Sequence, residues 1–123
     1  MTLKELLKNS IEGTGEVGET LMKTTADLVK EGGHDIEEIF GAVIELGKDG
    51  TVDVTEGVKG VFVGSVKALE ESGKSTEEAV EHVSQKAISA VGKVTEETEG
   101  EIGQAARKGI DEAKEVVKEP FEK

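Results

Sequence analysis

Three carboxylates that lie close together in the chain, Asp49, Asp53 and Glu56, are the residues whose types and spacing most suggest chemistry. Carboxylate oxygens are the hard ligands that Ca²⁺ prefers, and Gly50 between them permits the sharp turn that a cation-binding loop needs. The residues on either side have helical spacing, so the stretch 45–56 would join two helices. One prediction is therefore a calcium site built from Asp49, Asp53 and Glu56, and calcium is the one cofactor that the sequence suggests.

The second half of this stretch resembles the calcium loop of EF-hand proteins. The resemblance covers five positions of a twelve-residue loop that would begin at Glu45, namely Asp49 at five, Gly50 at six, Val52 at eight, Asp53 at nine and Glu56 at twelve. Glu45 stands where the family has Asp, and Gly47 removes the ligand of position three. Asp53 and Glu56 are equally suited to capping the N-terminus of a helix, so both interpretations stay open.

No other group of residues predicts a reaction. Carboxylates are too numerous for one pair to stand out, the two histidines lie far apart, and no grouping of Ser, His and Asp is suggested. Residues 13–18 have the spelling of a dinucleotide loop, but they follow a helical pattern instead of a strand. Residues 68–75 match a loose phosphate-loop pattern, in which Gly73 and Ser75 are explained as a helix stop and the next N-cap. We therefore expect that the protein is not an enzyme.

Composition limits the partners and the location. The formal net charge of −12, with Arg107 as the single arginine, disfavours nucleic acid and anionic membranes as partners. The absence of cysteine excludes disulfides and thiolate metal sites and fits a reducing compartment, so a cytoplasmic location is expected. The sequence has no run of about 18 apolar residues, so no membrane-spanning segment is predicted.

The strongest pattern in the chain is an apolar stripe near its C-terminal end. Apolar and small residues recur there at gaps of three, four and four, which is a period of eleven residues and keeps the stripe on one side of a nearly straight helix. The stripe consists of Val80, Val83, Ala87, Val91, Val94, Thr98, Ile102, Ala105, Gly109, Ala113 and Val116. This hendecad pattern predicts one unbroken helix over 75–119.

Four N-cap patterns set the number of helices. Each pattern places a short acceptor three residues before a glutamate, beginning at Thr2, Asp35, Asp53 and Ser75. Glycines at 32–33, 50 and 73 provide the stops, so helices are expected at about 2–31, 35–47, 53–72 and 75–119. Within the third helix, Gly57, Gly60 and Gly64 line one edge of the apolar face, where a neighbouring backbone could come close. The predicted fold is a single all-α domain over 1–123, an antiparallel four-helix bundle with a long C-terminal helix.

An internal similarity recurs at a spacing of about 40 residues. Residues 14–28 align with 55–69, residues 35–38 with 75–78, and residues 54–60 with 94–100. The turn at 49–53 has no counterpart in the second copy, which would fuse two of its helices into the long one. The best account is a degenerate duplication of a helical hairpin.

The length of the fourth helix leads to the expected function. At 1.5 Å per residue it would exceed the first helix by roughly 20 Å, so part of its stripe would lack cover from its own chain. We therefore expect a homodimer, with the eleven stripe residues as a coiled-coil-like interface. The predicted function is a non-enzymatic interaction or scaffold protein that self-associates or binds another helical protein.

Two alternatives belong to other functional classes. Residues 80–117 are similar in style to stress-protective, apolipoprotein-like and granule-coating helical proteins, which implies an amphipathic protein that coats lipid or other apolar surfaces. The other alternative is a degenerate EF-hand-like protein whose helices respond to calcium at 45–56.

Overall fold

The computed structural model of the 123-residue chain describes residues 2–11, 17–32, 35–95 and 100–121. These residues form six helices and no strand, which confirms the all-α prediction but not the count of four. The helices are α1 (Leu3–Ile11), α2 (Val17–Glu31), α3 (Ile36–Lys48), α4 (Val54–Glu71), α5 (Thr76–Thr95) and α6 (Glu101–Phe121).

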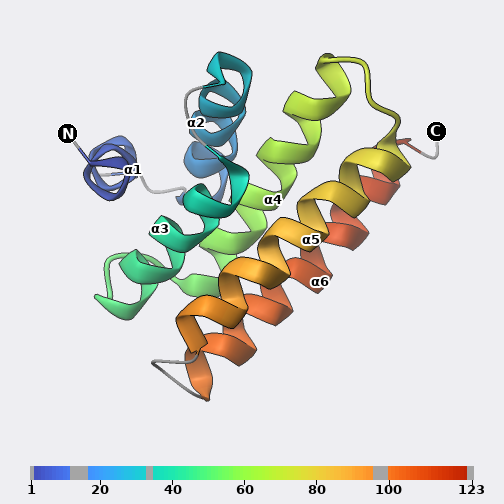
Figure 1. Ribbon diagram of the computed structural model, residues 1–123. Coiled ribbons are helices and arrows are strands. Elements are labelled where there is room, and N and C mark those ends of the chain that lie inside the picture. The colour runs from blue at the N-terminus through green and yellow to red at the C-terminus, as the bar shows by residue number, and fades with distance from the viewer. Residues whose placement is uncertain (1, 12–16, 33–34, 96–99, 122–123) are drawn as a thin grey trace.

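The six helices form two layers, because each helix packs on the helix two places further along the chain. One layer contains α1, α3 and α5, and the other contains α2, α4 and α6. Across the layers α1 packs on α2, α3 on α4, α4 on α5, and α5 on α6. Figure 1 shows α4 between α2 and the α5–α6 pair, with α5 in front of α6. This is a stack of helical hairpins, the arrangement found in α-solenoids, rather than a four-helix bundle.

The helix starts follow the sequence pattern closely. Thr2 and Glu5 form a reciprocal capping box, in which the Glu5 amide donates to the Thr2 hydroxyl at 3.1 Å. Ser75 and Glu78 form a second box, with the Glu78 amide donating to the Ser75 hydroxyl at 3.2 Å. Asp35 accepts from the amide of Glu37, one residue earlier than the box pattern predicts. Side-chain acceptors therefore satisfy first-turn amides that have no partner inside the helix.

Helix α4 is the centre of the fold, because it packs against four other helices, α2, α3, α5 and α6. Its buried residues include Val58, Val61 and Phe62, which are fully inaccessible to solvent. The Phe62 ring meets Phe40 of α3 edge to face, with ring centroids 6.4 Å apart and an interplanar angle of 65°. The core is otherwise aliphatic, as expected from the low aromatic content of 2%.

The glycines of α4 lie where α2 crosses closely. A Cβ atom on Gly60 would lie 2.5 Å from the carbonyl oxygen of Gly18, and one on Gly64 would meet the carbonyl oxygen of Met22 at a still shorter distance. Because Gly18 lies opposite Gly60 and Met22 opposite Gly64, α2 and α4 run in the same direction with an offset of 42 residues. A tandem hairpin repeat of about 40 residues produces this parallel stacking, so the packing supports the duplication inferred from the sequence.

The prediction of one unbroken helix over 75–119 is wrong. Helix α5 ends at Thr95, α6 begins at Glu101, and the two helices pack against each other as a hairpin (Figure 1). Gly100 has a φ of 92°, a left-handed conformation that glycine adopts without steric cost and that interrupts a helix. Thr98 is the only stripe residue between Val94 and Ile102, so no apolar side chain there favours continuation of the rod.

The prediction of one helix over 2–31 is also wrong. Helix α1 ends at Ile11 and α2 begins at Val17, and residues 12–16 lie outside the described part of the chain. Helix α1 packs against both α3 and α2, and Figure 1 shows it end-on while α2 lies across the view. Because α1 does not continue along the axis of α2, it can contact α3. Leu7 and Ile11 of α1 are buried. The other two helices, α3 and α4, lie within one residue of the ranges 35–47 and 53–72.

Candidate functional site

Two of the three carboxylates of the predicted calcium site, those of Asp49 and Asp53, are engaged in other contacts. The Asp49 carboxylate lies 2.6 Å from the ammonium of Lys4, and hydrogen bonding and charge attraction from Lys4 lower the pKa of Asp49. Asp53 caps α4 by accepting from the amide of Glu56 at 3.2 Å. Over the described ranges of the chain, no group of three or more His, Asp or Glu side chains is placed to hold a metal ion. The capping interpretation of Asp53 and Glu56 therefore describes the geometry, and the calcium site stays a prediction.

Of the two glycine-containing patterns, the one at 68–75 is a helix end followed by a helix cap. Gly73 has a φ of 107° directly after α4, and Ser75 caps α5, as the helix-stop interpretation predicts. Of the pattern at 13–18, only residues 17 and 18 belong to the described ranges, and Gly18 lies in α2 against α4. His34 is outside the described residues, and His82 is half-buried on α5.

The predicted stripe packs against helices of its own chain. Five of its members are buried, namely Val83, Ala87, Val91, Gly109 and Ala113. Val80, Ile102 and Ala105 are partly buried, Val116 is exposed, and the Thr98 residue and the Val94 side chain lie outside the described part. The sequence predicted a projecting length of helix whose apolar stripe no other part of the chain would contact. The fold has no such projection, because α6 turns back and packs on α5 and α4.

The buried face of α6 is shifted by one residue from the predicted stripe. The buried positions on α6 are Gly103, Ala106, Gly109, Ile110, Ala113 and Val117. Val116 is 37% exposed whereas Val117 is 2% exposed. Because α6 is a separate helix that begins at Glu101, packing on α4 and α5 determines which of its faces is buried. Its buried face therefore need not continue the apolar period of α5. This rotation places Val116 on the surface beside α2 and α4.

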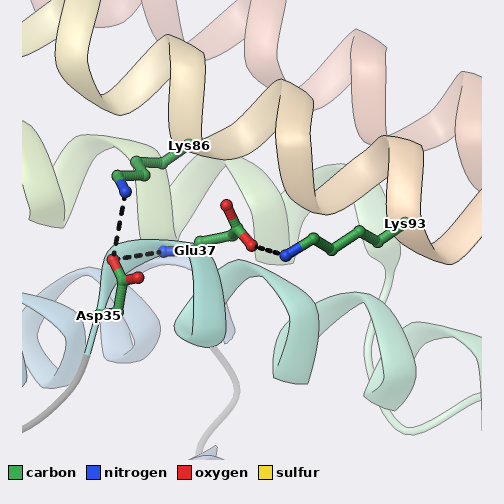
Figure 2. A network of polar contacts seen from close by, with 4 residues as sticks. All are labelled: Asp35, Glu37, Lys86 and Lys93. Carbon is green, nitrogen blue, oxygen red and sulfur yellow. Dashed lines mark hydrogen bonds and ion pairs between the residues drawn. The ribbon is translucent and has the colours of Figure 1, made fainter.

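One polar cluster joins α3 to α5 (Figure 2). The Glu37 carboxylate pairs with the Lys93 ammonium, and the Asp35 carboxylate, which also caps α3, lies 3.8 Å from the Lys86 ammonium. Hydrogen bonds from Lys93 and Ser89 lower the pKa of Glu37, and the bond with Glu37 raises the pKa of Lys93. Each carboxylate of α3 pairs with a lysine of α5, so the cluster links the two helices.

This cluster predicts a specific loss of stability in acid. A carboxylate whose pKa is lowered by folding stabilises the protein above its ordinary pKa, and that contribution disappears as the pH falls through the folded-state value. For Glu37 the loss should therefore appear below about pH 4. We expect the free energy of unfolding of Glu37→Gln to fall less between pH 6 and pH 3 than that of the unaltered chain. Urea titrations at each pH provide the measurement.

A matched substitution separates this effect from the relief of general charge repulsion. Glu81 is exposed on α5, away from α3, and Glu81→Gln removes the same charge. Its pH profile should follow that of the unaltered chain. If the Glu37→Gln and Glu81→Gln profiles coincide, the ion pair with Lys93 does not contribute to stability in solution.

A groove lies over α4, with α2 on one side and α6 on the other. It consists of two adjoining hollows of about 490 and 370 Å³, and both are lined by Met22, Val63 and Val116. Val117 adds to the apolar part of the larger hollow. We call this feature the α4 groove, and its charged lining residues are Glu19, Glu56, Lys59, Lys67, Glu70 and Glu71.

Each apolar lining residue of the α4 groove has a clear structural origin. Val63 lines both hollows from α4, and at helical spacing it falls outside the apolar face formed by Val54, Val58, Val61, Phe62 and Leu69. Met22 comes from the stretch of α2 that crosses Gly64, so the close helix crossing brings its side chain to the groove wall. Val116 reaches the groove because α6 is rotated by one residue. Only Val63 gave a signal in the sequence, as an apolar residue on the wrong face.

None of the helices in the described part of the chain is both long and apolar enough to cross a membrane. Comparisons with protein-family models, with curated proteins and with solved structures find no match to this chain.

Proposed function

We propose that the chain is a non-enzymatic interaction protein that binds a helical segment of a partner in the α4 groove. The observation that carries this proposal is the groove itself, an apolar floor at Val63 between walls formed by Met22 and Val116, with charged residues at both ends. An amphipathic helix binds in such a groove through apolar residues at positions i, i+3 or i+4, and i+7. The exposed Val116 would gain burial on binding.

The packing beneath the groove supports a preformed binding surface. Gly60 and Gly64 hold the α2 backbone directly against α4, so the floor and one wall of the groove are joined without flexible side chains between them. The other wall is held by Gly109 of α6, where an added Cβ would lie 2.6 Å from the carbonyl oxygen of Thr55. A rigid groove loses less conformational entropy when it binds a partner, which favours affinity.

The surface-coating alternative has less support. Its helix 80–117 would present the apolar stripe to lipid, but Val83, Ala87, Val91 and Ala113 are buried within the fold. These residues would reach an apolar surface only if α5 and α6 came apart. A homodimer is the other form of the interaction proposal, and the protein's mass in solution distinguishes it from binding to a different chain.

A neutral amphipathic peptide tests the groove directly. The probe is a fluorescein-labelled peptide of about 18 residues with Leu at helical spacing and only Ala and Gln elsewhere. We expect saturable binding by fluorescence anisotropy, and we expect Val116→Lys to weaken it by about tenfold because a charge would enter the apolar wall. Circular dichroism and thermal unfolding of each variant show whether the fold is kept.

The chain offers a matched control in Ile88, which is 59% exposed on α5 and lies outside the groove. Ile88→Lys makes the same kind of change and should leave peptide binding within about twofold of the unaltered chain. Equal losses for the two variants would contradict the assignment of the site. Absence of binding by the unaltered chain, together with a monomeric mass in sedimentation equilibrium, would contradict the proposed function.

A further inference from the structure

The charges on the exposed side of α4 are arranged symmetrically about Val63. Lys59 and Lys67 lie four residues before and after it, and Glu56 and Glu70 lie seven residues before and after it. Residues at spacings of four and seven share one face of a helix, so these side chains follow the line of the groove. At 1.5 Å per residue, the lysines are roughly 12 Å apart and the glutamates roughly 21 Å apart.

Carboxylates dominate at the two ends of the groove. Glu19 of α2 lies beside Glu56 in the lining of the smaller hollow, and Glu71 adjoins Glu70 in that of the larger one. Three of these charges already have ion-pair partners: Lys59 lies 3.7 Å from the carboxylate of Glu112, Glu19 lies 3.3 Å from the ammonium of Lys23, and Glu71 pairs with Lys30. Glu56 and Glu70, at the two ends, form no ion pair with the described residues. The lining thus holds four glutamates and two lysines, in a chain whose net charge is −12. The field of the groove favours a cationic partner.

The symmetric pattern also disfavours a second copy of the chain as the occupant. A two-fold dimer that crosses at Val63 with antiparallel α4 helices would place Lys59 opposite the partner copy's Lys67, and Glu56 opposite its Glu70. A parallel crossing would place each of these residues opposite its own equivalent. Both arrangements bring like charges together, and such contacts act against association.

We infer that the occupant of the α4 groove is a basic amphipathic helix from another protein. This inference rests on the proposed function and specifies its partner. The helix would carry an apolar anchor opposite Val63, an acidic residue about one turn to each side, and Lys or Arg about two turns to each side. Because the charge pattern reads the same in both directions, charge alone would not select the direction in which the helix binds.

Two charged peptides test the inference, each with the same Leu positions as the neutral probe. The basic-ended peptide has Glu at four and Lys at seven residues from its central Leu, with further Lys at both ends, and the reversed peptide exchanges Lys and Glu at all of these positions. At 50 mM NaCl we expect the basic-ended peptide to bind about tenfold more tightly than the reversed one. At 0.5 M NaCl salt screening should reduce this difference to about twofold.

Charge reversal on the protein provides the second test. The double variant Glu56→Lys with Glu70→Lys should reverse the order of the two charged peptides. Glu81→Lys with Asp111→Lys changes the net charge by the same amount at exposed positions outside the groove lining and should keep the original order. Thermal unfolding shows whether each variant is folded. The neutral peptide should bind both variants, because it does not depend on the charges.

The possible results separate the inference from the proposed function. Equal binding of both charged peptides, or equal effects of the two double variants, would overturn the inference, while continued binding of the neutral peptide would uphold the groove as a site. A dimeric mass that Val116→Lys reduces to a monomer would identify a second copy as the occupant, which also overturns the inference. Absence of binding by all three peptides would contradict the proposed function itself.

Discussion

Replacing Gly64 with alanine is expected to destabilise the protein strongly, although alanine is the better helix former. The added Cβ would collide with the carbonyl group of Met22, which belongs to the backbone of α2 and cannot rotate away as a side chain could. Helices α2 and α4 would have to separate, which would open the most extensive helix contact of the fold. We expect a net loss of about 2 to 3 kcal/mol in the free energy of unfolding, measured by urea titration.

The same change at Gly92 is the matched control. Gly92 is helical and exposed, and a Cβ there would meet no atom within 4 Å. Gly92→Ala should therefore stabilise the protein by about 0.5 to 1 kcal/mol through helix propensity alone. If alanine lowers the free energy of unfolding at position 64 and raises it at position 92, the close crossing of α2 and α4 exists in solution. If Gly64→Ala also stabilises the protein, the two backbones are not in contact.

The sequence predicted this crossing because its cause is local. Three glycines at positions 57, 60 and 64 lie on one edge of α4, and two of them, Gly60 and Gly64, leave room for the backbone of α2 to approach closely. The helix starts at Thr2, Asp53 and Ser75 were predictable for the same reason, since each depends on side chains within one turn. The pattern could not show which helix crosses the glycines, because that choice depends on the whole fold.

The break between α5 and α6 shows where local patterns fail. An eleven-residue period passes through 94–102 without a change of phase, so periodicity alone favours a continuous rod. Because the chain folds back, α6 packs against both α4 and α5. The stability gained from this packing depends on other helices, so it cannot be read from the pattern of one segment. Two residues signalled a break in the helix: Gly100, and the polar Thr98 at a stripe position. The internal repeat instead aligns Gly100 with Gly60, a glycine inside a helix, and not with Gly50, the glycine of a hairpin turn.

The α4 groove could not be predicted for a related reason. Its apolar residues come from three helices that are far apart in the sequence: Met22 on α2, Val63 on α4, and Val116 on α6. The eleven-residue period predicts burial of Val116 and not of Val117, whereas the structure buries Val117, because packing on α4 and α5 sets the rotation of α6. A site of this kind is defined by how the helices stack, whereas the capping residues are defined by the sequence near them.

Replacing Phe62 with alanine is expected to have the largest effect of any single side-chain truncation in the core. Phe62 is fully buried in the central helix, and its ring packs edge to face on Phe40, the only aromatic pair among the described residues. Its removal would leave a cavity where α3 and α4 meet and would lose the ring contact. We expect a loss of about 3 to 5 kcal/mol in the free energy of unfolding. This is a large part of the 5 to 15 kcal/mol typical of a domain.

A double-mutant cycle with Phe40→Ala isolates the ring contact from the cavity. If the edge-to-face pair stabilises the junction of α3 and α4, the double variant should be less destabilised than the sum of the two single changes, by about 0.5 to 1.5 kcal/mol. Val116→Ala removes two methyl groups from a side chain that is 37% exposed, so it should cost only about 1 kcal/mol, well below the loss for Phe62→Ala. Additive losses for the two phenylalanines would mean that their rings do not touch, and the α3–α4 packing that supports the groove floor would then be wrong.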